Sequence, residues 1–183
     1  MINNIIIING KNTYTIDGDI TWIELTQGKY GIIDTEDIHL TWPYRWSAFR
    51  SRKTFYVTRT EHIKYKSITI RLHREILKSP KNHLTDHKNH NGLDNRKLNL
   101  RMCTIKQNSQ HRQKTSDDEF SPYVGVYKVH VHRPPYKWIA SINPNGKKVH
   151  LGTYDTIEEA VNIRNAAAKK YFGEFAYQIN LTK

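Results

Sequence analysis

The sequence predicts an α+β protein, and three observations support this prediction. Short apolar segments that alternate with polar residues and end at turn pairs such as Asn-Gly fill residues 1–60. Residues 84–113 have the pattern of a strand, a polar loop, a second strand and a helix. Residues 121–183 contain three alternating segments and then one amphipathic helix. We therefore expect a β-rich N-terminal region over 1–60, a strand–loop–strand–helix module over 61–115, a linker over 116–120, and a three-stranded antiparallel sheet packed on one helix over 121–183.

The N-terminal region begins with two expected hairpins. Ile5–Ile8 has the composition of a buried strand, and the turn at Asn9-Gly10 pairs it with residues 14–16. Residues 22–25 and 30–33 flank Gln27-Gly28, which predicts a second hairpin. Small antiparallel strands therefore make up this region.

The chain between this region and the module supplies aromatic core candidates and short elements. Trp42 and Trp46 lie among basic residues, but large aromatic side chains of this kind favour a core position over a nucleic-acid surface. The further elements expected are a short helix at 37–40, strands at 54–58 and 67–70, and a helix at 72–77 that ends before Pro80.

The module places candidate chemical groups at the ends of its elements. Asp86 and His87 lie at the end of its first strand, and Thr104-x-x-Gln107 has the form of a helix capping box with Asn108 next to it. Folding as a hairpin and a helix would bring Asp86, His87 and Asn108 around one cavity. A carboxylate and an amide oxygen are hard ligands that suit Mg²⁺, and an imidazole can accept a proton from water. These groups indicate metal-assisted hydrolysis of a phosphodiester.

Eleven positions of the module match a known motif at fixed spacing: Asp86, His87, Asn89, Asn91, Asp94, Asn95, Asn99, Leu100, Thr104, Gln107 and Asn108. This pattern resembles the ββα-metal motif of phage-type HNH homing endonucleases, and the upstream L-H-R-E-I-L resembles the segment that precedes it there. The resemblance implies that Asp86 and Asn108 bind one divalent cation, Mg²⁺ or alternatively Mn²⁺. It also implies that His87 is the general base and that Asn99 holds the loop that aims His87. Asn108 replaces the final His of the motif, as it does in the phage enzymes.

The charge distribution predicts a polyanionic partner. The chain carries a net charge of +12, and by count residues 61–115 hold 13 basic and 4 acidic side chains. Each phosphate that a Lys or Arg neutralises releases counterions, so double-stranded DNA is the expected partner. A membrane surface would also satisfy the charge, but we find no basic amphipathic helix with a lipid-facing stripe, and expect no membrane partner.

The cysteine count and the hydropathy exclude several further classes of protein. The single Cys103 excludes an internal disulfide and a multi-cysteine zinc site, and we expect no structural zinc. A zinc site made only of histidines, from His83, His87 and His90, is the alternative. Ile5–Ile8 is too short for a membrane span and lacks a basic leader. We therefore expect an intracellular protein, in the cytoplasm of a bacterial host if a phage encodes it.

The acidic residues over 116–120 end the basic trend, and a different pattern follows. Strands are expected at 123–130, 136–142 and 147–151, with a tight turn at 143–146. Thr156 and Glu159 form a second capping box, which starts a helix that ends before Gly173.

Three segments of this region, Y-V-G-V-Y, K-W-I-A-S-I and H-L-G-T-Y-D-T-I-E-E-A, resemble the plant ethylene-response-factor (apetala-type) DNA-binding domain. Strand alternation places Trp138, Ala140 and Ile142 toward the helix, so the opposite face would meet the major groove. The plant domain has several Arg and Trp residues on that face, and this chain differs there. The expected DNA-binding residues are Tyr127, Lys128, Arg133, Lys137, Ser141, Asn143, Lys147, Lys148 and His150.

The leading hypothesis is a homing-type HNH DNA endonuclease whose C-terminal sheet holds duplex DNA while the module cuts one strand. One active site per chain predicts nicking by a monomer, and leaves monomer and homodimer both open. The alternative is a sequence-specific DNA-binding transcription regulator with an inert nuclease module. An RNA-binding protein is disfavoured because no aromatic RNP-like strand occurs.

Overall fold

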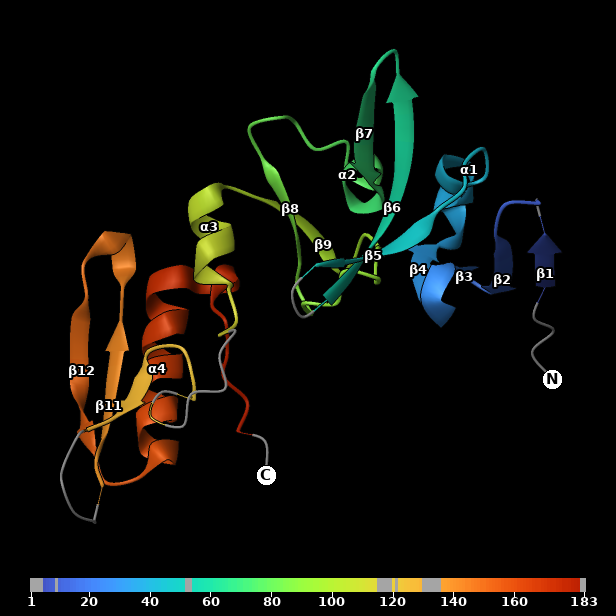
Figure 1. Cartoon of the computed structure of the whole chain (residues 1–183). Coiled ribbons are helices and arrows are strands. Elements are labelled where there is room, and N and C mark those ends of the chain that lie inside the picture. Colours follow the sequence, from blue (N-terminus) through green and yellow to red (C-terminus); the bar gives the residue numbers. More distant parts are fainter. Residues whose placement is uncertain are drawn as a thin grey trace. The chain divides into compact units, whose positions relative to one another are not determined.

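The protein is α+β, with small antiparallel sheets and few helices, as the sequence predicts (Figure 1). The structure, a computed structural model, describes residues 5–8, 10–51, 54–114, 120, 122–129 and 136–181. These form two compact units, residues 1–104 and residues 105–183, which are treated separately below. Within the described residues, none of the helices has the length and hydrophobicity needed to cross a membrane.

The first unit starts with a four-stranded antiparallel sheet in the order of the chain. Its strands are β1 (Ile5–Ile8), β2 (Thr13–Asp17), β3 (Ile20–Glu24) and β4 (Tyr30–Asp34). Both expected hairpins form, and Gln27 adopts a positive φ of 62° in the turn between β3 and β4. The prediction that β1 is buried is wrong. Ile5, Ile6 and Ile8 are 57, 64 and 73% exposed, because β1 is the edge strand of the sheet.

A three-stranded sheet and three short helical elements follow. The elements are η2 (Thr35–Asp37), α1 (Ile38–Thr41), β5 (Ser47–Ser51), β6 (Thr54–Ile63), β7 (Lys66–Arg71) and α2 (Leu72–Ile76). The sheet has the order β5–β6–β7, and β6 is twice as long as the expected strand. The last elements of the unit are β8 (Leu84–His87) and β9 (Leu100–Cys103), which pair antiparallel.

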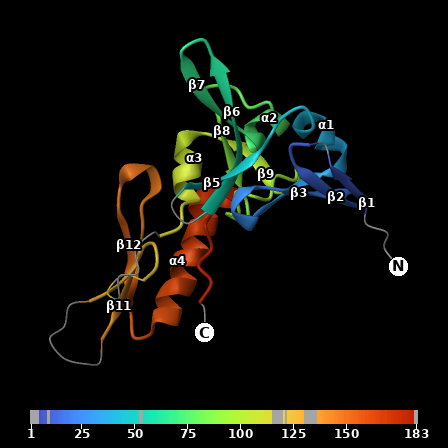
Figure 2. The ribbon, with the colours of Figure 1, turned by 45° about the vertical axis from the view of Figure 1, so that its right-hand side comes forward.

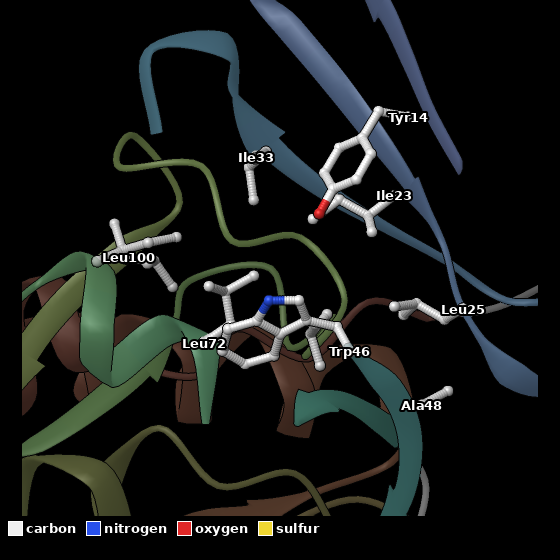
Figure 3. Close-up of a cluster of buried hydrophobic side chains, with 10 residues drawn as sticks. Tyr14, Ile23, Leu25, Ile33, Trp46, Ala48, Leu72 and Leu100 are labelled. Carbon is white, nitrogen blue, oxygen red and sulfur yellow. The ribbon is translucent and has the colours of Figure 1, made fainter. Parts of the chain in front are cut away.

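One hydrophobic core joins the N-terminal region to the module. Side chains from β2, β3, β4, β5, α2 and β9 converge in it, and Figure 3 shows Trp46 at its centre beside Leu72. Trp46 is 1% exposed, and its indole nitrogen donates a hydrogen bond to the carbonyl of Thr41 at 3.0 Å. Leu100 of β9 is also buried. The core prediction is therefore correct for Trp46 but wrong for Trp42, which is 38% exposed and packs its ring on that of Tyr14.

Apolar residues alternate with polar ones at 98, 100 and 102, but the burial of these side chains follows this pattern only in part. Leu98 and Met102 are 85 and 51% exposed, so Leu100 alone of these three enters the core. Cys103 is buried, and burial raises the pKa of its thiol to about 11, which keeps it protonated. The structure gives this thiol no role beyond packing.

The second unit contains a three-stranded sheet covered by one helix (Figures 1 and 2). Its elements are α3 (Ile105–Gln110), β10 (Val126–Lys128), β11 (Trp138–Ile142), β12 (Val149–Tyr154), α4 (Ile157–Phe172) and η4 (Gly173–Phe175). The capping box of Thr156 and Glu159 forms as expected, and Gly173 ends α4 with a φ of 55°. Val126, Ala140, Ala160, Val161 and Ile179 are the buried residues of its core.

Candidate active site

The β8–β9 hairpin places Asp86 and His87 side by side at the end of β8. Asp86 lies directly opposite Arg101, and His87 lies opposite Leu100. The Arg101 guanidinium donates two hydrogen bonds to Oδ2 of Asp86, from Nε at 2.9 Å and from a terminal nitrogen at 2.7 Å. Both side chains are only 10% exposed, so the ion pair is shielded from water. Arg101 was not predicted, although counting along the expected hairpin would have placed it opposite Asp86.

His87 lies in a cluster of aromatic rings. Its ring centroid is 4.9 Å from that of His73 in α2 and 5.8 Å from that of Tyr56 in β6. Burial lowers the pKa of His87, and the side chain of Asn95 and the charge of Asp86 oppose this shift. His87 is therefore neutral at pH 7, the form that can accept a proton. Its Nε2 lies 3.5 Å from Oδ1 of Asn95, at the limit of a hydrogen bond.

The pKa of His73 is lowered more strongly than that of His87. Burial and the neighbouring His87, Arg71 and Arg74 lower the pKa of His73 to about 3. His73 is 4% exposed, as is typical of a structural histidine. Its contact with His87 gives it a place in the site that the sequence did not predict.

The loop between β8 and β9 is held together by polar side chains. Asn99 accepts a hydrogen bond at Oδ1 from the backbone of Asn89 at 3.0 Å, and its amide donates to the carbonyl of Asp94 at 2.7 Å. The carboxylate of Asp94 accepts two hydrogen bonds from Arg96, at 2.8 and 2.7 Å. Burial would raise the pKa of Asp94, but Arg96 and Asn89 lower it, so the carboxylate stays charged. Asn99 thus ties together the two ends of the loop that leads from His87.

The N-terminal strands fix the position of this loop. Ile32 of β4 exchanges backbone hydrogen bonds with the loop, donating to Leu93 at 2.8 Å and accepting from Asn95 at 2.7 Å. Gly92 approaches β6 so closely that a Cβ atom would collide with the carbonyl of Phe55 and the ring of Tyr56. Only glycine therefore fits at position 92. Residues 1–60 therefore support the loop between β8 and β9, a role that the sequence did not indicate.

The fourth predicted residue, Asn108, lies on α3 in the second unit and is exposed. Its approach to Asp86 stays a prediction. The donor chemistry fits Mg²⁺, because Mg²⁺ is often held by one or two protein oxygens while waters and substrate phosphates complete its shell. Among the described residues, no three His, Cys, Asp or Glu side chains gather as a metal-binding group, and this includes His83, His87 and His90, the zinc alternative.

The sheet of the second unit exposes part of the predicted DNA-binding set. The ammonium group of Lys148 lies 4.5 Å from the centroid of the Tyr127 ring, which places both side chains on one face. Asn143, Lys147 and His150 are exposed on the turn and strand beside them. Lys137 is exposed as well and pairs with Asp155 at 2.9 Å. Arg133 lies outside the described residues.

Two members of the predicted set are placed differently. Ser141 is 5% exposed, because a bulge between Ala140 and Ser141 interrupts the alternation of β11 and both residues become buried. Lys128 is paired opposite Trp138 and lies on the side of the sheet that carries Val126. Its ammonium group lies 3.9 Å from the centroid of the Tyr136 ring. The sheet face predicted to meet DNA therefore carries Tyr127, Lys148 and His150, together with the residues of the adjoining turn.

Comparison with known proteins finds a similarity that extends over most of the chain. The chain is 28% identical over 176 residues to an uncharacterized HNH endonuclease of Acanthamoeba polyphaga mimivirus, and the similarity covers 92% of this chain and 85% of that protein. An overlap of this extent includes residues 84–113. No family model matches the chain. No solved structure matches it either.

Proposed function

We propose that this chain is an HNH-type DNA endonuclease that hydrolyses one phosphodiester bond of duplex DNA. The observation that carries the proposal is the neutral, buried His87 beside the carboxylate of Asp86, on a hairpin whose loop is fixed by Asn99. The similarity of most of the chain to a viral protein named as an HNH endonuclease supports it independently. A homing-type activity is the finer form of this proposal.

Each residue of the hairpin has a distinct part in the proposed reaction. His87 accepts the proton of the attacking water, because its imidazole is neutral at pH 7. Asn99 and Asn95 limit the movement of the loop and of the imidazole. A divalent cation, Mg²⁺ or Mn²⁺, held by Asp86 and Asn108 would stabilise the charge that develops on the phosphate. One such centre per chain cuts one strand, so a single chain nicks the duplex.

The sheet of the second unit is the proposed holder of the duplex. Its face with Tyr127, Lys148 and His150 offers one positive charge, hydrogen-bond donors and an aromatic ring. Side chains of these types contact phosphates and base edges in the major groove. The charge of +12 on the whole chain favours the same partner.

One observation favours a second candidate, a DNA-binding transcription regulator with an inert nuclease module. Oδ2 of Asp86 already accepts two hydrogen bonds from Arg101, so the ion pair competes with a cation for this oxygen. In the endonuclease the cation must share or displace this guanidinium. In the regulator the ion pair is permanent.

A nicking assay on supercoiled plasmid with Mg²⁺ or Mn²⁺ separates the two candidates. We expect conversion to open circles by the native chain, and a loss of at least about a hundredfold in His87→Ala, since general base catalysis contributes that much or more. Asp86→Ala is expected to abolish cutting while binding to DNA persists. His39→Ala changes an exposed histidine of the same unit and serves as the control. Full cutting by His87→Ala and Asp86→Ala would refute the proposed mechanism.

A further inference from the structure

The distal half of the β6–β7 hairpin, residues 60–69, extends away from the rest of the first unit. β5 pairs with β6 only between Thr54 and Thr58, and in the described part of the chain no third strand adjoins the hairpin beyond that point. Figures 1 and 2 both show the two strands projecting past their neighbours. All residues from 60 to 69 are exposed except the half-buried Glu61. We call this segment the distal ribbon.

A two-stranded ribbon with both faces in water has little stability of its own. This one is anchored at its root, where Val57, Thr58 and Arg59 are 0, 6 and 7% exposed. The distal ribbon contributes nothing to the core of the unit. The packing of the core therefore does not explain why the hairpin extends this far.

The side chains of the distal ribbon suit contact with nucleic acid. The strand register places Thr60 opposite Thr69 and His62 opposite Ser67 on one face, where hydroxyl and imidazole groups can donate and accept hydrogen bonds. The Ser67 hydroxyl already lies 3.0 Å from Nδ1 of His62. At the turn, Tyr65 is fully exposed, and the neighbouring Ile63 is 51% exposed.

The charge of the distal ribbon is positive and uncompensated. Lys64 and Lys66 flank Tyr65 at the tip, and within the described residues neither has a carboxylate partner. The one acid, Glu61, is paired with Arg59 at the root. A polyanion therefore complements this surface, and the two exposed lysines can contact phosphates.

The root of the hairpin belongs to the candidate active site. The ring centroid of Tyr56 is 5.8 Å from that of His87, and Tyr65 follows nine residues later on the same hairpin. The strand runs seven residues from Tyr56 to its end at Ile63, so at about 3.4 Å per residue the tip lies roughly 24 Å from Tyr56 along the hairpin. A duplex advances about 3.4 Å per base pair along its axis, so a ribbon of this length can span up to roughly seven base pairs. The major groove is wide enough to admit a two-stranded ribbon.

We propose that the distal ribbon enters the major groove of the DNA substrate and contacts it up to about seven base pairs to one side of the cut. The distance to the cut rests on the proposed function, whereas contact with duplex DNA does not. The ribbon thus extends the DNA contacts of the first unit beyond its nuclease hairpin.

A shortened hairpin tests this proposal directly. Arg59 and Ile70 are register partners, so replacing residues 60–69 by Asn-Gly closes a type I′ turn on the intact root. The change removes four residues from each strand, about 14 Å of ribbon or about four base pairs. Hydroxyl-radical footprints of the full-length and the shortened protein are recorded on a nicked or cleaved DNA target. Both proteins carry His87→Ala, so that binding is measured without cutting. We expect protection to retract by about four base pairs on one side only.

A point variant guards against misfolding of the shortened chain. Lys64→Gly with Lys66→Thr keeps the turn, since Lys64 has a φ of 52° that suits glycine. Loss of two phosphate contacts should lower the slope of log K against log salt by about 1.8. Lys169→Ala with Lys170→Ala removes the same charge from exposed positions on α4 and serves as the matched control.

The outcomes separate the ribbon from the nuclease proposal. Unchanged footprints and salt slopes in the ribbon variants, or equal losses in the α4 control, overturn the proposal whatever the nicking assay gives. Retracted protection in a chain that never cuts keeps the ribbon as a DNA contact and refutes only the proposed function. A dimer that disappears on shortening, with DNA contacts intact, assigns the ribbon to a second copy of the chain and also overturns the proposal.

Discussion

His73 and His87 illustrate how burial changes the chemistry of a single residue type. Their rings meet edge to face at 4.9 Å, and both have lowered pKa values because charged imidazolium is costly away from water. Within the described residues, Nδ1 of His73 is buried without a hydrogen-bond partner. The pair is therefore stable only while both rings are neutral.

This pair predicts loss of stability in acid. The pKa of His73 is about 3 in the folded chain and 6.5 for an imidazole in water, so between these values the unfolded chain binds the extra proton and stability falls as pH decreases. At pH 5 the cost is about 2 kcal/mol relative to pH 7 or above. We expect His73→Phe to show a shallower decline in the free energy of unfolding between pH 7 and 5, measured by urea denaturation. A matching change at the exposed His62 should leave the decline unaltered, and an unaltered decline in His73→Phe would exclude His73 as its source.

The ion pair between Asp86 and Arg101 makes a second prediction for single residues. Arg101→Met leaves a carboxylate that is 10% exposed without its guanidinium, at a cost of about 3 kcal/mol in unfolding free energy. Adding Asp86→Asn removes the charge that the guanidinium had balanced, so the double variant should lose less than the sum of the two single losses. Thermal or urea unfolding of all four chains measures this coupling. Strict additivity would mean that the two groups do not interact in the folded chain.

At the scale of elements, β9 combines packing and chemistry on four residues. Leu100 enters the core while Arg101 pairs with Asp86, so the strand that stabilises the unit also contributes to the candidate active site. The exposed Leu98 precedes the strand and has no such part, although the alternation in the sequence makes both leucines look alike.

The two leucines form a matched pair for a stability test. Leu100→Ala removes a side chain that is 4% exposed and leaves a cavity, at an expected cost of about 3 kcal/mol. Leu98→Ala removes one that is 85% exposed and should change stability by less than about 0.5 kcal/mol. Equal effects in denaturant titrations would contradict the assignment of Leu100 to the core.

The bulge in β11 shows an element-scale feature that no alternation rule contains. The rule placed Ser141 on the face away from the helix, and the register shift after Ala140 buries it instead. Its backbone nitrogen donates to the carbonyl of Gly125 at 2.7 Å, an interaction with a residue far along the chain. A period of two residues describes only an uninterrupted ladder.

For the molecule as a whole, the charge of +12 should make the proposed binding to DNA strongly dependent on salt. The exposed face of the second unit should supply part of this dependence. We expect Lys148→Ala with His150→Ala to weaken binding and to lower the slope of log K against log salt by about 0.9, one phosphate contact. Fluorescence anisotropy over a salt series measures this, with Lys169→Ala as the control for charge. Unchanged affinity and slope would move the DNA-holding role away from this face.

The sequence alone determined the local features of this protein. Turn residues, alternation and capping boxes located the hairpins of residues 1–60, the β8–β9 hairpin and the capped helix α4, because these depend on neighbours in the chain. The positions of Asp86 and His87 at the end of β8 followed from the same short-range rules.

Only the tertiary structure decided which surfaces meet. Four features depend on residues that are distant in sequence. They are the docking of the β8–β9 loop on β4, the fit of Gly92 against β6, the burial of His73 and the exposure of β1. Alternation specifies that a strand has two faces, but the neighbours that cover each face decide which is buried. The projecting ribbon of β6 and β7 is the clearest case, because its pattern suits a sheet and only the absence of a third strand, within the described residues, leaves it open to a partner.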